Sequence, residues 1–313
     1  MRRMLACCAA VVAVGLCTSG SAGAAGTNGR IAFSTGGFVL PYGDRDVGAQ
    51  VWSVAPGGSG LRQLTHVKNG NDAANPAWSP DGSRIAYQSD PTGEYDVWVM
   101  NADGTNQHLL LKDEGYDDEQ PSWSPGGKQL VFARCDALFE CDMEVVNADG
   151  TGMHRVVGGH RVNSFPQFSP DGRWIAFTSD RAGLQSAIWK VRPDGSGLQR
   201  LTAARLEAFA NDWSPDGSEI LFTDDCCLPF SEVYVMNADG SGVRRLTRSA
   251  SGHQTGIARF APDGRHMVFM SDSAYPDACC NDLFTSTLGG AGLKRLTHNA
   301  TWGAEFADWG RTP

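Results

Sequence analysis

Along most of the chain, short runs of alternating apolar and polar residues are separated by residues that form turns. One set of such runs lies at 84–87, 173–177 and 219–222, and a second set follows at 96–100, 187–191 and 232–236. Alternation with a period of two is typical of β-strands with one buried face. The pattern therefore predicts a chain built from short antiparallel strands.

A five-residue turn precedes each strand of the first set. Its fullest form is Trp-Ser-Pro-Asp-Gly at 213–217, with related copies at 78–82, 123–127, 168–172 and 260–264. Proline sets φ for the second position of a type I turn, aspartate accepts hydrogen bonds from nearby backbone N–H groups, and glycine takes the positive φ that follows. A second turn, Asn-Ala-Asp-Gly, follows the strands at 101–104, 147–150 and 237–240. Both turns predict tight hairpins.

The aromatic residue that opens the five-residue turn gives the length of the repeat. It recurs at a constant spacing at 78, 123, 168 and 213. A four-stranded unit of about 40 to 45 residues is typical of a propeller blade. A periodic aromatic residue on the innermost strand is expected to pack between blades. This prediction covers Trp78, Trp123, Phe168, Trp213, Phe260 and Trp309.

Six short closing strands predict six blades, at 61–65, 108–111, 154–157, 198–202, 243–247 and 293–297. The first unit has no five-residue turn before it, whereas the segment around Trp309 has no strands after it. We therefore expect the C-terminal strand to be the innermost strand of the first blade, which leaves the ring without an open edge. The sequence predicts an all-β, six-bladed propeller of four-stranded antiparallel blades, in a single domain over 26–313.

These motifs resemble the TolB-type β-propeller repeat. The resemblance rests on the Trp-Ser-Pro-Asp-Gly turn, on Ile-Ala-Phe-Thr-Ser-Asp at 175–180 and on Met-Asn-Ala-Asp-Gly at 236–240, and it extends from about Asn28 to Trp309. It implies a TolB-like propeller, a fold that similar exported scaffold proteins, some polysaccharide lyases and the gating domains of some peptidases share. We expect the chain to be too short for the N-terminal domain of TolB. A peptidase is not expected, because the sequence lacks a Gly-x-Ser-x-Gly nucleophile motif.

The N-terminus has the three regions of a secretory signal peptide. Arg2 and Arg3 precede an apolar run over 5–17, and small residues follow up to position 25. The run is shorter than the roughly 20 residues of a membrane-spanning helix. We expect residues 1–25 to be removed, leaving a periplasmic or secreted protein with no transmembrane segment.

Removal of the two arginines shifts the formal net charge from −9 to −11. An acidic surface disfavours binding to nucleic acid, because that binding depends on Lys and Arg at phosphates. We expect a monomer that binds a protein partner or an envelope glycan.

Six of the nine cysteines remain after this cleavage, and an even number in an oxidising compartment predicts disulfides. Cys135 and Cys141 flank a short loop of the third blade and are expected to pair. The others lie in the corresponding loops of the fifth and sixth blades: Cys226, Cys227, Cys279 and Cys280. Their connectivity stays open between two bonds within the adjacent pairs, two bonds between them, and a zinc or redox site.

Strand order places the tight turns on one face of the ring, the turn face, and the links between blades and the long mid-blade loops on the other, the loop face. Because its loops vary, we expect the loop face and the mouth of the central funnel to carry function. The candidate binding residues lie in the links: Asp117, Asp118, Glu119, Glu207, Glu305, His66, His298 and Trp302. Carboxylates around a funnel suit Ca²⁺. Since no EF-hand-type spacing is present, we expect no cofactor.

The sequence contains no recognisable catalytic constellation. We therefore expect a binding or interaction scaffold rather than an enzyme. The alternative is a carbohydrate-active lyase or hydrolase with a divalent cation in the funnel, which the resemblance to propeller lyases permits. Its candidate residues would be Asp117, Asp118, Glu119, Glu207 and His298.

Overall fold

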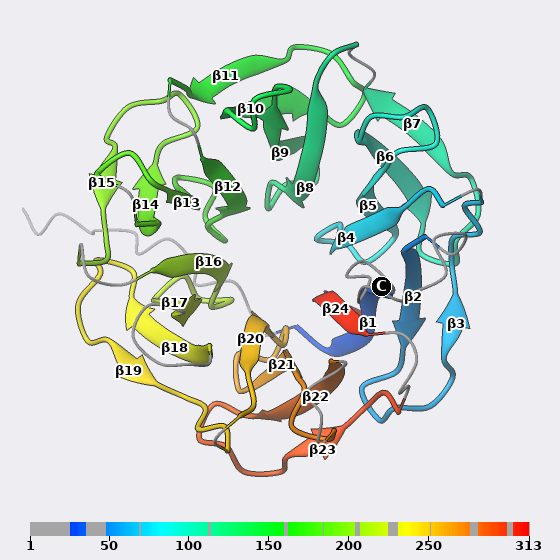
Figure 1. Ribbon diagram of the computed structural model, residues 1–313, viewed down its shortest axis with the longest axis vertical. Helices are drawn as coiled ribbons and strands as arrows, with labels where there is room; N and C mark the ends of the chain where they lie inside the picture. Colours follow the sequence, from blue (N-terminus) through cyan, green and yellow to red (C-terminus); the bar gives the residue numbers. More distant parts are fainter. Residues whose placement is uncertain are drawn as a thin grey trace, which may run out of the picture.

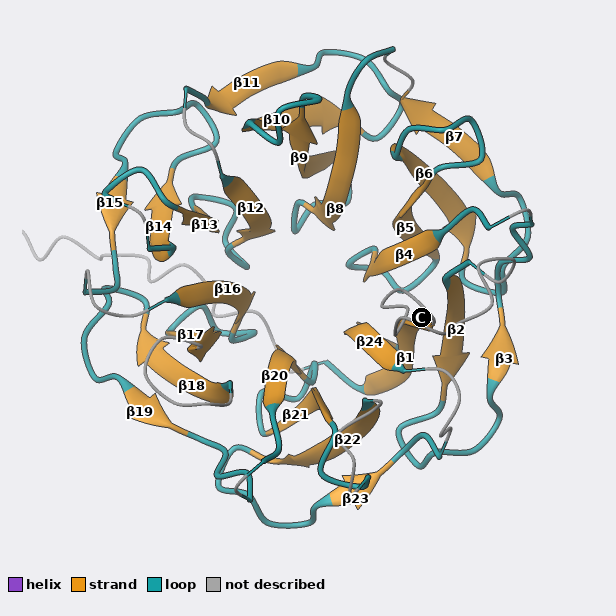
Figure 2. Ribbon diagram, in the orientation of Figure 1, coloured by secondary structure: helices purple, strands orange, loops and turns teal. Residues whose placement is uncertain are grey.

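A six-bladed propeller forms the whole described part of the chain (Figures 1 and 2). The computed structural model describes residues 26–35, 48–68, 70–111, 114–159, 162–183, 185–203, 207–224, 231–250, 252–275, 281–298 and 303–312. These residues form six four-stranded antiparallel sheets and no helix, so the described part offers no helix to cross a membrane. The predicted fold class is confirmed.

The strands of each blade run from the innermost to the outermost. Blade 1 consists of β24 (Ala304–Arg311), β1 (Asn28–Thr35), β2 (Gln50–Val54) and β3 (Arg62–Gln63). Blade 2 consists of β4 (Ala73–Trp78), β5 (Arg84–Ser89), β6 (Asp96–Asn101) and β7 (His108–Leu111), and blade 3 of β8 (Asp117–Trp123), β9 (Gln129–Cys135), β10 (Cys141–Asn147) and β11 (His154–Val157). Blade 4 consists of β12 (Asn163–Phe168), β13 (Ile175–Ser179), β14 (Ala187–Val191) and β15 (Gln199–Arg200). Blade 5 consists of β16 (Ala208–Trp213), β17 (Glu219–Asp224), β18 (Glu232–Asn237) and β19 (Arg244–Arg245), and blade 6 of β20 (Thr255–Phe260), β21 (His266–Ser271), β22 (Asp282–Thr287) and β23 (Lys294–Arg295).

The two ends of the described chain meet in blade 1. Strand β24 pairs antiparallel with β1, and Ile31 lies opposite Trp309 (Figure 1). Beyond the paired strands, the Thr312 N–H donates to the Thr27 carbonyl at 3.0 Å. The predicted closure of the ring by the C-terminal strand is therefore confirmed.

The five-residue turns form as their chemistry predicts. In blade 5, the Gly217 N–H donates to the Ser214 carbonyl at 2.8 Å, and Gly217 has a φ of 74°. The Asp216 carboxylate accepts hydrogen bonds from the Ser214 hydroxyl at 2.7 Å and from the Ser218 N–H at 3.0 Å. These bonds, led by that of the Ser214 hydroxyl, lower the pKa of Asp216.

The periodic aromatic residues pack between neighbouring blades, as predicted. Trp213 shares a hydrophobic cluster with Ala176 and Ile188 of blade 4. Its Nε1–H donates to the Gln167 carbonyl of that blade at 3.1 Å. Trp123 makes the equivalent bond to a carbonyl of blade 2. The aromatic layer thus joins each blade to the one before it.

All six innermost strands are irregular a few residues before the aromatic residue. Register shifts there mark β-bulges. Non-glycine residues with positive φ lie at these bulges: Asn75, Gln120, Phe165, Ile257 and Phe306. The rings of Phe165 and Phe306 stack at 6.4 Å, and Phe165 meets Phe209 edge-on at 6.3 Å. Because blades 1 and 4 lie opposite each other (Figure 1), the stacked pair crosses the central channel.

Candidate functional site: the channel mouth on the turn face

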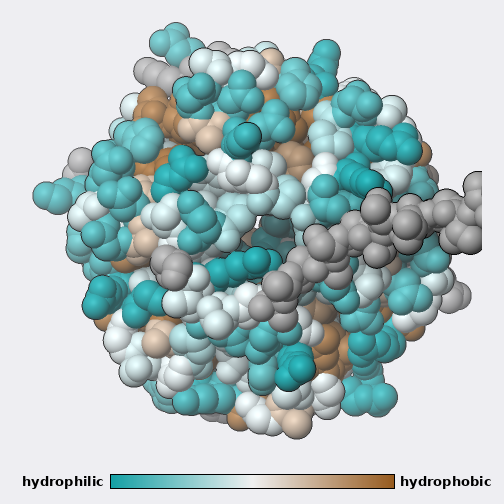
Figure 3. Space-filling model, turned by 180° about the vertical axis from the view of Figure 1, so that it is seen from behind, coloured by the Kyte–Doolittle hydropathy of each residue, from teal (hydrophilic) through white to brown (hydrophobic). Residues whose placement is uncertain are grey.

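A cavity of about 310 Å³ lies where the central channel meets the turn face. Figure 3 views this face and shows the hollow at its centre. The ends of the six innermost strands line the cavity, together with a rim of prolines from the five-residue turns: Pro80, Pro125, Pro170, Pro215 and Pro262. Since proline side chains are rigid and apolar, the rim is a fixed border around the polar centre.

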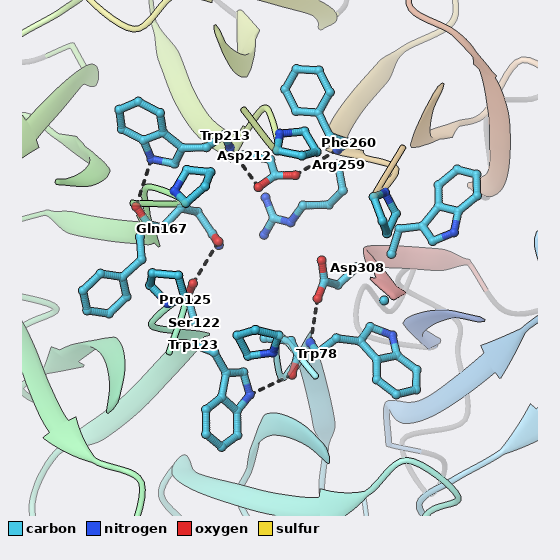
Figure 4. Close-up of a pocket in the computed structure, with 18 of the residues that line it drawn as sticks. Trp78, Ser122, Trp123, Pro125, Gln167, Asp212, Trp213, Arg259, Phe260 and Asp308 are labelled. Carbon is cyan, nitrogen blue, oxygen red and sulfur yellow. Dashed lines mark hydrogen bonds between the residues drawn. The ribbon is translucent and has the colours of Figure 1, made fainter. Parts of the chain in front are cut away.

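The centre is formed by the residue that precedes the aromatic residue in each blade. We call these six residues the channel mouth: Ala77, Ser122, Gln167, Asp212, Arg259 and Asp308. Each occupies the same position of its innermost strand, next to an aromatic residue that packs between blades. Blades 2 to 4 contribute neutral side chains, whereas blades 5, 6 and 1 contribute charged ones (Figure 4).

In the charged half, the Arg259 guanidinium points between the carboxylates of Asp212 and Asp308 (Figure 4). Asp212 accepts the Trp213 N–H through Oδ1 and the Phe260 N–H of the next blade through Oδ2, each at 2.8 Å. Asp308 likewise accepts a backbone N–H of the next blade, from Trp78, at 2.6 Å. The carboxylates therefore hold neighbouring strands together and also face the cavity.

Arg259 retains a free donor. Its Nη1 atom is buried and has no hydrogen-bond partner among the described residues. In the neutral half, by contrast, the Ser122 hydroxyl donates to Gln167 Oε1 at 2.9 Å. Because a buried donor without an acceptor costs free energy, the charged half is the part of the mouth that a ligand would complete.

The ionisation of the mouth depends on pH near neutrality. Burial raises the pKa of Asp212 to about 7, and the charge of Asp308 adds to the rise, while Arg259 opposes it. Burial also raises the pKa of Asp308, against the same guanidinium. The mouth therefore becomes more negative as the pH rises through about 7.

The acidic residues predicted on the loop face are largely engaged in the fold. Asp118, which is 1% exposed, forms a bidentate ion pair with Arg134 of the neighbouring strand, with both N–O distances at 2.8 Å. Asp117 accepts the Tyr95 N–H at 2.8 Å. The Asp118 carboxylate is therefore held in an ion pair inside the fold, and its role in binding stays a prediction.

The three glutamates predicted on the loop face are partly or fully buried. Glu119 is half-buried, and burial, with the charge of Asp117 adding to it, raises its pKa to about 7. Glu305 is buried, which raises its pKa, and it accepts a hydrogen bond from the Asn281 amide at 3.4 Å. Glu207 is half-buried.

His66 and His298 are exposed. Within the described ranges, no group of three or more His, Cys, Asp or Glu side chains is placed to hold a metal ion.

The disulfide predicted between Cys135 and Cys141 is present, with an S–S distance of 2.07 Å. It joins residues that lie opposite each other on β9 and β10. The remaining predicted residues lie outside the described residues: Trp302, Cys226, Cys227, Cys279 and Cys280.

Sequence reasoning did not single out Asp212, Arg259 or Asp308. A usable pattern was present, because aligning the six repeats on their aromatic residue brings these three charged residues into one column with three neutral ones. The variation among the loops predicts function on the loop face, whereas the cavity lies on the turn face.

Comparisons with known proteins concern the fold. The family model for the TolB beta propeller domain matches residues 115–230. An uncharacterised protein of Agrobacterium fabrum is 33% identical over 75 residues, which cover 24% of this chain and 25% of that protein.

Two solved structures are similar at the level of the whole propeller. TolB from Acinetobacter baumannii has a TM-score of 0.75 and 19% identity, covering 90% of this chain and 66% of TolB. An oligogalacturonate lyase in complex with manganese has a TM-score of 0.58 and 16% identity, covering 80% of this chain and 71% of the lyase. This chain thus spans a quarter of the curated relative and just under two thirds of TolB.

Proposed function

Because this chain carries a TolB-type six-bladed propeller, we propose that it is an exported, non-catalytic scaffold that binds a segment of a partner protein in its channel mouth. The observation that carries the proposal is the buried Nη1 of Arg259, which lacks a partner among the described residues and belongs to a side chain that lines the cavity. Export rests on the signal-peptide pattern of the first 25 residues.

The chemistry of the mouth fits a peptide segment with a basic side chain. Arg259 offers a donor for a backbone carbonyl, and Asp212 and Asp308 offer acceptors for a Lys or Arg side chain. The volume of about 310 Å³ is near the lower limit of ligand pockets, which span roughly 300 to 1,000 Å³. One or two side chains, held by the apolar proline rim, would fill it.

Nuclear magnetic resonance titration tests this proposal with defined probes. The probes are short capped peptides that differ in one central residue: Arg, Lys, Glu or Ala. We expect saturable shifts of the indole N–H signals of Trp123 and Trp213, which line the cavity, with the Arg and Lys peptides and not with the others.

Two variants provide the control. Asp308→Asn should weaken binding of the Arg peptide about tenfold, because it removes a carboxylate acceptor from a charged pair. Asp103→Asn, in an exposed turn outside the cavity, should leave it unchanged. Preference for the Glu peptide, or no saturable shift with any probe, would overturn the proposed binding mode.

A lyase is the second candidate, and the likeness to the manganese-bound oligogalacturonate lyase is the observation that favours it. Only the fold supports it at 16% identity. Incubation with oligogalacturonate and Mn²⁺, followed by ultraviolet absorbance of unsaturated sugar products, tests it directly. Turnover that depends on Mn²⁺ would replace the scaffold proposal with a lyase.

A further inference from the structure

Large hydrophobic side chains are exposed in two groups among the described residues. The first group repeats from blade to blade, directly after a glycine that follows the second turn: Leu61, Met153, Leu198, Val243 and Leu293. The second group belongs to blade 3 and has no such period: Tyr116, Leu138 and Phe139. Because the repeat does not require the second group, these residues are candidates for a function added to the scaffold.

Leu138 and Phe139 form the end of the loop between β9 and β10, on the loop face. Their side chains are 79% and 77% exposed, more than that of any other large hydrophobic residue in the described chain. The Cys135–Cys141 disulfide closes this loop at its base. We call residues 136–140 the tip.

Hydrogen bonds fix the shape of the tip. The Asp136 carboxylate accepts the N–H groups of Leu138 at 2.9 Å and Glu140 at 3.0 Å. The Phe139 N–H donates to the Asp136 carbonyl at 2.9 Å, and the Asp136 N–H donates to the Glu140 carbonyl at 3.0 Å. A partner would therefore meet a loop that is already ordered, which reduces the entropy lost on binding.

Phe139 occupies a position at which other blades have glycine. Gly93 of blade 2 and Gly183 of blade 4 donate the same N–H bond to the aspartate that opens the loop, and both have positive φ. Phe139 also has a positive φ, of 59°, a conformation that is unfavourable for a bulky residue. Since its ring is exposed, burial does not compensate this strain. Strained backbone of this kind is often found at functional sites.

The acidic side chains of the tip indicate which kind of partner it can bind. Acidic side chains flank the two apolar residues, Asp136 before them and Glu140 after them. The one nearby cation on the preceding strand, Arg134, is taken by Asp118. An anionic membrane surface would repel such a tip, whereas basic side chains would attract it.

We propose that the tip is a docking element that inserts Leu138 and Phe139 into an apolar pocket of a partner protein, with Lys or Arg residues at the pocket's rim. This contact lies on the loop face, opposite the channel mouth. It does not depend on what the mouth binds.

Site-specific photocrosslinking and affinity measurement test the proposal. A benzoylphenylalanine at position 138 of the full chain is activated in the cells that produce the protein, and the adduct is identified by mass spectrometry. The captured protein is then purified, and its Kd is measured for the unmodified chain, for Phe139→Gly and for Glu140→Lys. We expect Phe139→Gly to weaken binding about tenfold or more, because it removes the phenyl ring that the partner's pocket would bury. Glu140→Lys should weaken it several-fold, and less so at high salt.

Two controls separate docking from folding. Phe139→Gly introduces the residue that blades 2 and 4 use, so its melting temperature should equal or exceed that of the unmodified protein. Leu293→Ser, at a 64% exposed residue of the periodic group, should leave the Kd unchanged.

Four outcomes would overturn the proposal. These are an adduct with a second copy of the chain, an adduct with lipid, no adduct, and a Kd that does not respond to Phe139→Gly. Loss of binding to vesicles of phosphatidylcholine and phosphatidylglycerol in Phe139→Gly would point to a membrane instead.

Discussion

Two adjacent layers of the innermost strands behave differently although they are one residue apart. The aromatic layer contains Trp or Phe in all six blades, and these side chains pack between blades. The channel mouth has six positions with five different side chains, and those side chains line the cavity. Because successive residues of a strand point to opposite sides, the first layer is constrained by packing and the second is not. The comparison teaches that the repeated aromatic residue maintains the fold, whereas the residue before it can vary and can take part in binding.

The largest effect is expected from the aromatic layer. Trp213→Ala removes a buried indole and its bond to Gln167, so the free energy of unfolding should fall by about 3 to 5 kcal/mol. Chemical denaturation measures this free energy. Leu198→Ala, at an exposed position of blade 4, should change the free energy of unfolding by less than about 0.5 kcal/mol. A small loss for Trp213→Ala would mean that the aromatic layer does not hold the blades together.

A smaller loss is expected when the cation of the mouth is removed. Arg259→Met leaves two carboxylates facing each other, which should cost about 1 to 3 kcal/mol and raise the pKa of Asp212 further. Carboxyl chemical shifts followed against pH measure the titration. Arg259→Lys retains a positive charge, so the pKa of Asp212 in this variant should lie close to its value in the unmodified protein. An unchanged pKa in Arg259→Met would show that the guanidinium does not act on Asp212.

The pH dependence of stability separates two aspartates of the same blade. The pKa of Asp212 is raised to about 7 in the folded state, against about 3.9 in unfolded chains. Between these values the folded state binds more protons, so the contribution of Asp212 to stability falls as the pH rises from about 4 to about 7. Asp212→Asn should remove this decline, as measured by denaturation at a series of pH values.

For Asp216, four residues later, the contribution to stability changes with pH in the opposite direction. Its pKa is lowered in the folded state, so its contribution is present above the unfolded value of about 3.9 and is lost as the pH falls below it. Asp216→Asn should therefore reduce stability at neutral pH and have little effect in strong acid. If Asp212→Asn and Asp216→Asn change the pH dependence of stability in the same direction, the predicted difference between turn and mouth carboxylates is wrong.

The smallest effect is expected in the neutral half of the mouth. Ser122→Ala removes the hydroxyl that donates to Gln167, at a cost of about 0.5 to 1.5 kcal/mol. It should leave binding of the Arg peptide unchanged, as measured by the same titration. A strong loss of binding would place the ligand across the whole mouth rather than at its charged half.

The sequence was sufficient for the architecture because turns and spacing repeat. The Asp-Gly turns, the periodic aromatic residues and the unpaired strand around Trp309 each have a local signature, and together they predicted six blades and their closure. The pairing of Cys135 with Cys141 followed from the short loop between them.

The candidate site was harder to predict because it depends on contacts without a local signature. Phe165 and Phe306 adopt positive φ, a conformation that sequence reasoning reserves for glycine and asparagine, since the bulge and packing impose it. Asp118 looks like a ligand in an acidic run, and only strand register reveals its pairing with Arg134. The role of Arg259 likewise depends on the folded ring, which brings it between Asp212 of blade 5 and Asp308 of blade 1.

The pairing of β1 with β24 has a consequence for how the molecule folds. Blades 2 to 6 consist of consecutive strands, whereas blade 1 joins the first described strand to the last. Contacts between residues so far apart in sequence carry the largest loop-closure entropy and form slowly. During synthesis, β1 to β3 therefore wait as an incomplete sheet until residues 304–311 have emerged. Until then the inner edge of β1 is an open template, and the strand best suited to fill it from outside is β24 of another copy, an exchange that would link two rings.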